Sequence, residues 1–406
     1  MVTRCTTGLL VSLLALAAIA ASGTDLAMAA HARAPRMKLA QAHSLGTHTC
    51  AARLRARPAH LTARRRHRIA KRARNCRERI ATVSSVPHQP LYWGASIGTQ
   101  LTGGQAPWDM SAVTKFEGLA DKSLSLLNFF VPFANCGEPN CSFYKFPTTP
   151  LENIRQHGAI PMLSWSSQSI PSSTNEPDFQ LSDVISGRYD AYIREFAEAA
   201  RAWQHPFFLR FDWEMNGNWF PWSEGVNGNQ PGEFVAAWRH VHDIFSSVGA
   251  TNVTWVWCPN VDPSGDLQKV ESLYPGNEYV DWTGLDGYNW GPRKGGWKTF
   301  NQLYQSTYHQ ITDSLAPSKP MLIGEMGSTE QGGSKANWIN EAMTSISTEY
   351  PAIRGLLWYD CVDEGMDWPI ESSPGSAESF ARAIKSPEFQ GNSYANLAPT
   401  TIAPPS

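Results

Sequence analysis

The chain has 406 residues, of which 42% are hydrophobic, and a formal net charge of −2. This small net charge conceals two oppositely charged parts, because residues 31–90 hold fifteen Lys or Arg and one acid, whereas residues 91–406 have a balance of −16. No segment after the first thirty residues contains as many as eighteen consecutive apolar residues, which excludes a membrane span beyond them.

Residues 1–29 have the pattern of a secretory signal peptide. Arg4 precedes the apolar run Gly8–Ala21, and residues 27–29 (AMA) form a small-x-small cleavage site. The apolar run is shorter than the roughly 20 residues that span a membrane, so we expect cleavage and secretion of the mature protein. A retained N-terminal membrane anchor is the alternative.

Residues 30–88 are predicted to be a disordered basic linker. They include Arg64-Arg65-Arg66 and few large apolar side chains, so they cannot bury enough surface to fold alone. One interpretation is a solvated tether, and the other is a segment that adheres to anionic cell-wall polymer through its clustered charge. Nucleic acid is not an expected partner, since no motif that reads it accompanies the arginines.

Six cysteines follow the predicted signal peptide, and an even number in an exported chain favours disulfides, although fifteen connectivities are possible. We expect Cys136 and Cys141 to close a local loop. No spacing of cysteines and histidines resembles a zinc site, so no metal or other cofactor is expected.

Residues 89–390 alternate between strand-like and helix-like runs, which predicts parallel β/α units and, with eight strands, a single (β/α)8 TIM barrel. An open doubly wound sheet is the alternative, but no Gly-rich phosphate loop follows a first strand. Residues 391–406, rich in Pro and Thr, are predicted to be a disordered tail. The strand-like runs are Leu91–Gly98, Ser123–Phe133, Gly158–Ser166, Pro206–Asn216, Asn252–Asn260, Val280–Trp290, Lys319–Ser328 and Ile353–Cys361, and the clearest helical runs are Arg188–Trp203, Gly232–Val248, Thr299–Leu315 and Ser334–Glu349.

Two glutamates close apolar runs, Glu214 in the fourth strand-like run and Glu325 in the seventh. A buried charge is costly unless it is paired or hydrogen-bonded, so acids at such positions need a reason. A single glutamate there often caps a helix or pairs with an arginine. Two together, at the strand ends where a barrel places its active site and with tryptophans nearby, indicate the paired carboxylates of a glycosidase.

The segment Arg210–Trp222 (RFDWEMNGNWFPW) resembles the acid/base motif of glycoside hydrolase family 26, the β-mannanase family. The resemblance extends from about Tyr92 to Asp360 and implies a (β/α)8 barrel and hydrolysis with retention, by double displacement. It implies that Glu214 is the acid/base and Glu325 the nucleophile.

Further site residues follow from the same resemblance and its neighbourhood. Tyr288 resembles the tyrosine that orients the nucleophile, Trp358 the strand-eight tryptophan beneath the sugar, and Trp219 the tryptophan five residues past the acid/base. Period-two alternation in the strand would place Arg210 and Asp212 on the same face as Glu214. The remaining substrate-binding candidates are Arg210, Asn216, Trp213 and Trp222.

One departure from the family concerns the substrate. Trp213 stands where family mannanases have His directly before the acid/base. We expect an endo-acting, monomeric enzyme on β-1,4-mannan, with mixed-linkage β-glucan and β-1,3-xylan as alternatives. A barrel that binds glycans without hydrolysing them is the alternative from another functional class.

Overall fold

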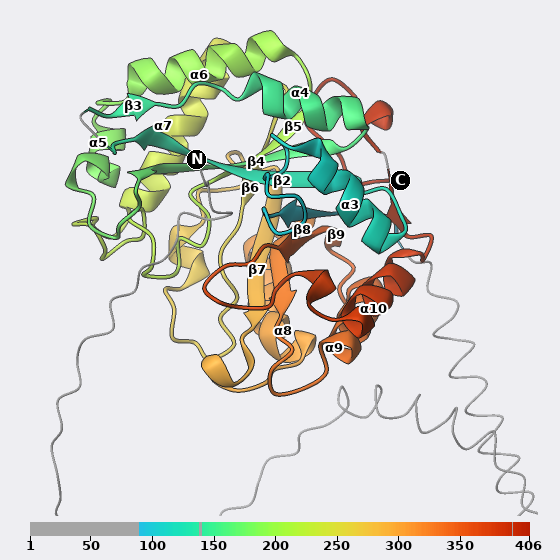
Figure 1. The fold of residues 1–406 in the computed structure, drawn as a ribbon. Helices are drawn as coiled ribbons and strands as arrows, with labels where there is room; N and C mark the ends of the chain where they lie inside the picture. The colour runs from blue at the N-terminus through green and yellow to red at the C-terminus, as the bar shows by residue number, and fades with distance from the viewer. Residues whose placement is uncertain (1–88, 138–139, 392) are drawn as a thin grey trace, which may run out of the picture. The chain divides into compact units, whose positions relative to one another are not determined.

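The computed structural model describes residues 89–137, 140–391 and 393–406, so the predicted signal peptide and basic linker lie outside the described residues. Eight parallel strands form a closed barrel with helices outside it (Figure 1). Each strand pairs with the next, and β1 pairs with both β2 and β9, which closes the ring and confirms the predicted TIM barrel over an open sheet. The barrel strands are β1 (Leu91–Ile97), β2 (Leu126–Asn135), β4 (Ile160–Ile170), β5 (Phe207–Phe211), β6 (Val253–Trp257), β7 (Trp282–Asn289), β8 (Met321–Ser328) and β9 (Ile353–Asp360).

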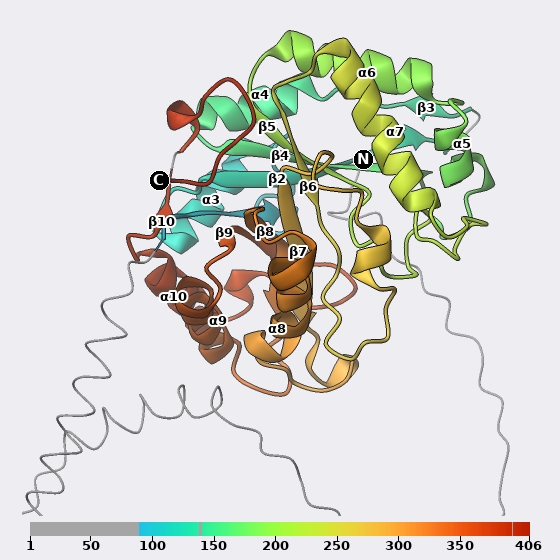
Figure 2. The same cartoon turned by 180° about the vertical axis from the view of Figure 1, so that it is seen from behind.

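The helices begin where the sequence supplies caps. Thr299 and Gln302 form a capping box at the start of α8, and the side chain of Ser334 accepts a hydrogen bond at the start of α9. Helices α6 and α7 lie side by side on the outside (Figure 2). The helices are α3 (Met110–Ala120), α4 (Thr148–His157), α5 (Leu181–Ile185), α6 (Asp190–Trp203), α7 (Glu233–Val248), α8 (Phe300–Gln310), α9 (Lys335–Glu349) and α10 (Pro374–Ile384).

Short elements complete the described chain. Strand β3 (Ser142–Phe143) pairs antiparallel with the end of β2, and β10 (Phe389–Gln390) pairs with the start of β1. The predicted disulfide between Cys136 and Cys141 is present. Within the described residues, no helix is both long and apolar enough to cross a membrane. Single-turn helices are η1 (Pro177–Phe179), η2 (Val270–Leu273), η3 (Gly291–Arg293), η4 (Ile311–Leu315), η5 (Ile370–Ser372) and η6 (Tyr394–Asn396).

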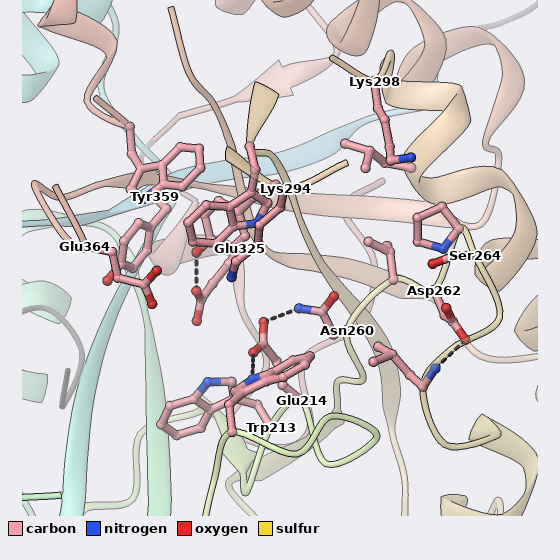
Figure 3. A pocket seen from close by; sticks show the side chains of 18 of the residues that line it. Trp213, Glu214, Asn260, Asp262, Ser264, Lys294, Lys298, Glu325, Tyr359 and Glu364 are labelled. Carbon is pink, nitrogen blue, oxygen red and sulfur yellow. Dashed lines mark hydrogen bonds between the residues drawn. The ribbon is translucent and has the colours of Figure 1, made fainter. Parts of the chain in front are cut away.

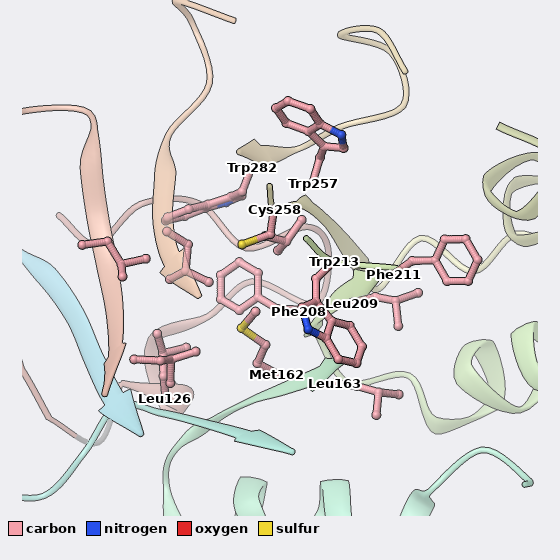
Figure 4. Packing of buried hydrophobic residues seen from close by; sticks show 14 of the residues in the cluster. Leu126, Met162, Leu163, Phe208, Leu209, Phe211, Trp213, Trp257, Cys258 and Trp282 are labelled. Atoms are coloured by element: carbon pink, nitrogen blue, oxygen red, sulfur yellow. The ribbon is translucent and has the colours of Figure 1, made fainter. Parts of the chain in front are cut away.

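Large apolar side chains pack on both sides of the barrel wall. Phe208 is the strand partner of Met162, and its ring meets the edge of Trp282 at 5.3 Å between centroids (Figure 4). On the outer side, Trp165 stacks on Phe196 of α6 at 4.3 Å. Each such buried side chain contributes about 1.5–3 kcal/mol to stability, so the wall is a rigid frame for the residues at its ends.

The C-terminal residues pack against the start of the barrel strands, which corrects the prediction of a disordered tail. Ile402 is only 3% exposed, its N–H donates to Thr254 Oγ1 at 2.7 Å, and its carbonyl accepts from Trp282 Nε1 at 2.8 Å. The hydroxyl of Tyr92 donates to the carbonyl of Ala403. The Pro- and Thr-rich composition suggested disorder, but one apolar anchor and these hydrogen bonds hold the tail in place.

Candidate active site

The backbone turns sharply between the end of β5 and Glu214. Asp212 and Glu214 have φ angles of 41° and 54°, in the left-handed region, so the regular alternation that would place Arg210, Asp212 and Glu214 on one face does not hold. Asp212 instead accepts hydrogen bonds from the N–H and hydroxyl of Ser167 on β4. The N–H of Glu214 donates to the carbonyl of Cys258, which ties the turn to the end of β6.

Glu214 and Glu325 line the same cavity, of about 300 Å³, and both side chains point into it (Figure 3). Most of the remaining lining comes from the last residues of β7 and β9 and from loops that follow β5, β6, β7 and β9. The cavity therefore lies at the C-terminal ends of the strands, as the barrel predicts. Aromatic side chains make up much of its wall: Trp213, Trp219, Phe220, Tyr288, Trp290, Tyr359 and Trp368.

Each carboxylate oxygen of Glu214 accepts one hydrogen bond. Trp219 Nε1 donates to Oε2 at 2.6 Å, and Asn260 Nδ2 donates to Oε1 at 2.6 Å. Burial, and then the nearby Glu325 carboxylate, raise the pKa of Glu214 to about 7, against the opposing effect of the two donors. A carboxyl group with this pKa can hold a proton near neutral pH and release it to a leaving group.

Glu325, in the middle of β8, differs from Glu214 because one of its two hydrogen-bond donors is a cation. Its Oε1 accepts from Arg210 Nη2 and its Oε2 accepts from the hydroxyl of Tyr288. Arg210 is fully buried and also contacts both oxygens of Asp286, at 3.0 and 2.8 Å. Burial raises the pKa of Tyr288 well above its usual value, so this side chain stays a donor. A carboxyl group with a guanidinium and a hydroxyl donor beside it suits a nucleophile.

The structure separates the predicted aromatic residues into two groups. Trp213 and Trp219 line the cavity. Trp222 is fully buried, stacks on Phe220 and donates to the carbonyl of Trp213, so it lies behind the wall. Trp358 is also fully buried, and its Nε1 donates to the carbonyl of Trp368. The prediction that Trp358 stacks on sugar is therefore wrong for this structure, and Trp368 occupies the wall instead.

Arg210 and Asn216 do not line the cavity but hold residues that do. The side chain of Asn216 donates to the carbonyl of Asn260 and accepts from its N–H, both at 2.8 Å, which fixes the asparagine that contacts Glu214. The guanidinium of Arg210 lies 4.9 Å from the ring centre of Trp213. Arg210 and Asn216 therefore support Glu325 and Asn260 and do not reach a sugar in the cavity, contrary to the prediction that they bind substrate directly.

Sequence reasoning missed several lining residues, above all Asn260, Trp290 and Trp368. Asn260 and Trp290 end predicted strand-like runs, so the rule that strand ends carry the site could have found them. Trp368 lies eight residues beyond β9 and gave no such signal. Among the described residues, no group of three or more His, Cys, Asp or Glu could hold a metal ion.

Comparison with known proteins agrees with this geometry. The profile described as Glycosyl hydrolase family 26 matches residues 151–313. Endoglucanase H of Acetivibrio thermocellus is 33% identical over 299 residues, which cover 72% of this chain and 30% of that protein. The chain belongs to glycosyl hydrolase family 26.

Other members of the family are similar over less of the chain or at lower identity. Mannan endo-1,4-beta-mannosidase A and B of Caldalkalibacillus mannanilyticus is 30% identical over 177 residues, which cover 41% of this chain and 29% of that protein. The catalytic domain of the family 26 endo-beta-1,4-mannanase of Bacillus sp. JAMB-750 superposes with a TM-score of 0.58 at 15% identity, covering 77% and 89% of the two chains. This chain thus spans about a third of the length of endoglucanase H and of the Caldalkalibacillus mannosidase. The solved mannanase structure shows the shared fold.

Proposed function

We propose that the chain is a retaining endo-β-glycanase, in which Glu325 is the nucleophile and Glu214 the acid/base. The observation that carries the proposal is the contrast between two glutamates on one cavity. Glu214 is a carboxyl group with a pKa of about 7, and Glu325 is held by Arg210 and Tyr288. Pairs of carboxyl groups with such different environments are the basis of acid/base and nucleophile assignment in glycosidases.

The reaction proceeds in two displacements. Glu325 attacks the anomeric carbon while Glu214 donates its proton to the glycosidic oxygen, so the bond to the leaving sugar breaks as the bond to Glu325 forms. Water then attacks the same carbon, gives its proton to Glu214, and releases Glu325. This scheme requires carboxyl groups roughly 5–5.5 Å apart. The loss of Trp219 or Asn260 would leave Glu214 without one of the donors that orient it.

For the substrate we propose β-1,4-linked or mixed-linkage glucan first. The relative that matches over 299 residues is an endoglucanase, and Trp213 replaces the His that mannanases have beside the acid/base. Glucose and mannose differ only in the orientation of the C2 hydroxyl, the group whose hydrogen bonds strengthen in the transition state. A changed residue beside Glu214 is therefore in a suitable place to change the preference of the site between glucose and mannose.

β-1,4-Mannan is the second candidate. It is favoured by the 30% identity to a mannan endo-1,4-beta-mannosidase over 177 residues. Because β-1,4-glucan and β-1,4-mannan share their linkage, discrimination between these two polymers rests on the contacts to the C2 hydroxyl. A modest contact of this kind separates substrates by roughly 1–3 kcal/mol.

We also propose that the protein is exported and acts on extracellular polysaccharide. The signal-peptide pattern of residues 1–29 supports this, although these residues lie outside the described part of the chain. A disulfide within the barrel, between Cys136 and Cys141, is typical of oxidising compartments.

The test is a screen on mixed-linkage glucan, cellulose, mannan and β-1,3-xylan with product sizes resolved, followed by proton NMR of the first product formed. We expect internal cleavage and a product that initially has the β configuration. An initial α product would contradict double displacement. Binding to a glycan without any release of reducing ends would favour the non-catalytic alternative.

A further inference from the structure

A lysine ammonium lies fully buried behind the cavity wall. Lys335 is the first residue of α9 and its side chain has no solvent exposure. Both facts are unfavourable, because a buried charge is costly and the N-terminal end of a helix repels cations. The reaction proposed above does not use this residue, so its placement needs another explanation.

The side-chain hydrogen bonds of Lys335 all lead to one segment, residues 367–372. Its Nζ donates to the backbone carbonyls of Asp367, Trp368 and Pro369 at 2.5, 2.9 and 2.7 Å, and to the hydroxyl of Ser372 at 2.9 Å. A lysine ammonium has three donors and can satisfy several carbonyls that converge on one point. The ammonium is thus hydrogen-bonded by residues 367–372, and the nearby carboxylates of Glu330, Asp360, Asp367 and Glu371 also favour its charge.

Two further buried side chains hold the same segment. Trp358 Nε1 donates to the carbonyl of Trp368 at 3.0 Å, and Asp360 Oδ1 accepts from the N–H of Ile370 at 2.8 Å. The Lys335 ammonium lies 5.8 Å from the ring centre of Trp358. The carbonyl of Trp368 therefore receives donors from two elements, α9 and β9, and the backbone there has little freedom.

The side chain of Trp368 faces the cavity. Its ring lies 4.9 Å from that of Tyr288, the donor to Glu325, and 4.9 Å from that of Trp290 in an edge-on arrangement. A shift of the segment would move this aromatic wall and the ring that packs against Tyr288.

We infer that Lys335 is a positioning residue that fixes Trp368 in the aromatic wall of the cavity, where its ring packs against Tyr288. The inference rests on the proposed glycanase function for its readout on substrate. Lys335 does not touch the sugar and acts only through the backbone of residues 367–372. Buried ionic groups are weak contributors to stability, and a role in specifying one arrangement accounts for this one.

The experiment compares Lys335→Met, Trp368→Ala and the double variant on the polysaccharide that the wild-type protein hydrolyses. We expect each single change to lower kcat/KM by about tenfold, mostly through KM, the scale of one lost aromatic contact. The double variant should fall no further than Trp368→Ala alone, because the ammonium acts through that ring. Fully additive losses would overturn the inference.

Ile346→Ala is the matched control for lost stability. Ile346 is buried in the same helix, three turns further along, so its truncation should lower the melting temperature without changing KM. If Lys335→Met behaves like Ile346→Ala, its role is structural only. If Lys335→Met does not fold, Lys335→Gln, which keeps donors on a shorter side chain, replaces it in the same comparison.

A second readout does not depend on activity. In protein labelled with 5-fluorotryptophan, the fluorine signal of Trp368 is assigned among the 16 tryptophans by its absence in Trp368→Phe. Lys335→Met should shift or broaden this signal, while Ile346→Ala should leave it unchanged. An unchanged signal in Lys335→Met would contradict the inference, whereas a lack of hydrolysis in wild-type protein would contradict only the proposed function.

Discussion

The protonation of Glu214 is set by a balance between burial and two hydrogen-bond donors. Burial disfavours the charged carboxylate, whereas Trp219 and Asn260 favour it, and the pKa settles at about 7. The proposed acid must be protonated for the first displacement. We therefore expect kcat/KM to fall as the pH rises above about 7.

Asn260→Ala should move this fall to higher pH. The change removes a donor to the ionised form, and a hydrogen bond to a charged group contributes about 1.5–3 kcal/mol, or roughly one to two pKa units. The pH profile of kcat/KM measures the shift. Asn252→Ala is the control, because Asn252 is buried but donates to the carbonyls of Ala200 and His205, away from Glu214. A shift to lower pH would contradict the assignment of Glu214.

The two glutamates can be distinguished by rescue with azide on an activated aryl β-glycoside. In Glu325→Ala, azide takes the place of the nucleophile and should give an α-glycosyl azide. In Glu214→Ala, Glu325 still forms the intermediate, so azide should give the β anomer, and polysaccharide hydrolysis should slow by about 10²–10⁴. Melting curves check the fold, since Arg210 keeps Asp286 as a partner in Glu325→Ala. A β azide from Glu325→Ala and an α azide from Glu214→Ala would instead make Glu214 the nucleophile and Glu325 the acid/base.

Trp213→His tests the residue that departs from the family. The indole is 2% exposed, lies over Arg210, and packs against Phe130 and Trp222, so its replacement changes the support of the guanidinium that contacts Glu325. We expect kcat/KM for mannan relative to glucan to rise by the equivalent of roughly 1–3 kcal/mol. Equal ratios on all substrates would show that Trp213 serves only packing.

At the scale of elements, the sequence allowed accurate prediction wherever one pattern dominated. The run Ser334–Glu349 was predicted as a helix and α9 begins one residue later, because Ser334 is a capping residue followed by regular apolar spacing. The run Pro206–Asn216 was predicted as one strand, yet β5 ends at Phe211. Positive φ angles at non-glycine residues gave no signal in the sequence, since tertiary contacts impose them.

The tail gives a second element-scale prediction. Removal of residues 393–406 should lower the free energy of unfolding by roughly 1–3 kcal/mol, because the burial of Ile402 is lost. Part of this loss is offset, since folding no longer has to order the removed residues. Activity at low temperature should stay unchanged, since the tail contacts the ends of strands opposite the cavity. Chemical denaturation measures the effect. Ile402→Ala should reproduce part of it and Thr401→Ala, at an exposed position, none of it. Equal stability of all variants would mean that the tail is not held as described.

At the scale of the molecule, both glutamates of the site were predictable because they interrupt apolar strands. Their partners were less so. Asp286 and Asn260 reach the site through the closure of the barrel, which brings strand ends together from positions far apart in the chain. Trp368 depends on a loop held by Lys335 and Trp358, and such an arrangement cannot be derived from local sequence patterns.

The charge asymmetry of the chain gives the last prediction. Residues 31–90 have a balance of +14 against −16 for residues 91–406, and the barrel residues Gln89–Ser406 form a compact unit without them. A protein that begins at Gln89 should therefore hydrolyse soluble substrate like the full mature chain. The full chain alone should be retained on anionic cell-wall polymer, and its retention should weaken as salt rises from 0.01 M to about 0.15 M, where screening shortens to about 8 Å. A full chain with the arginines of residues 64–66 changed to glutamine is the matched control, and we expect intermediate retention. Retention that ignores salt, or activity lost on truncation, would contradict a role of this segment as a charged tether.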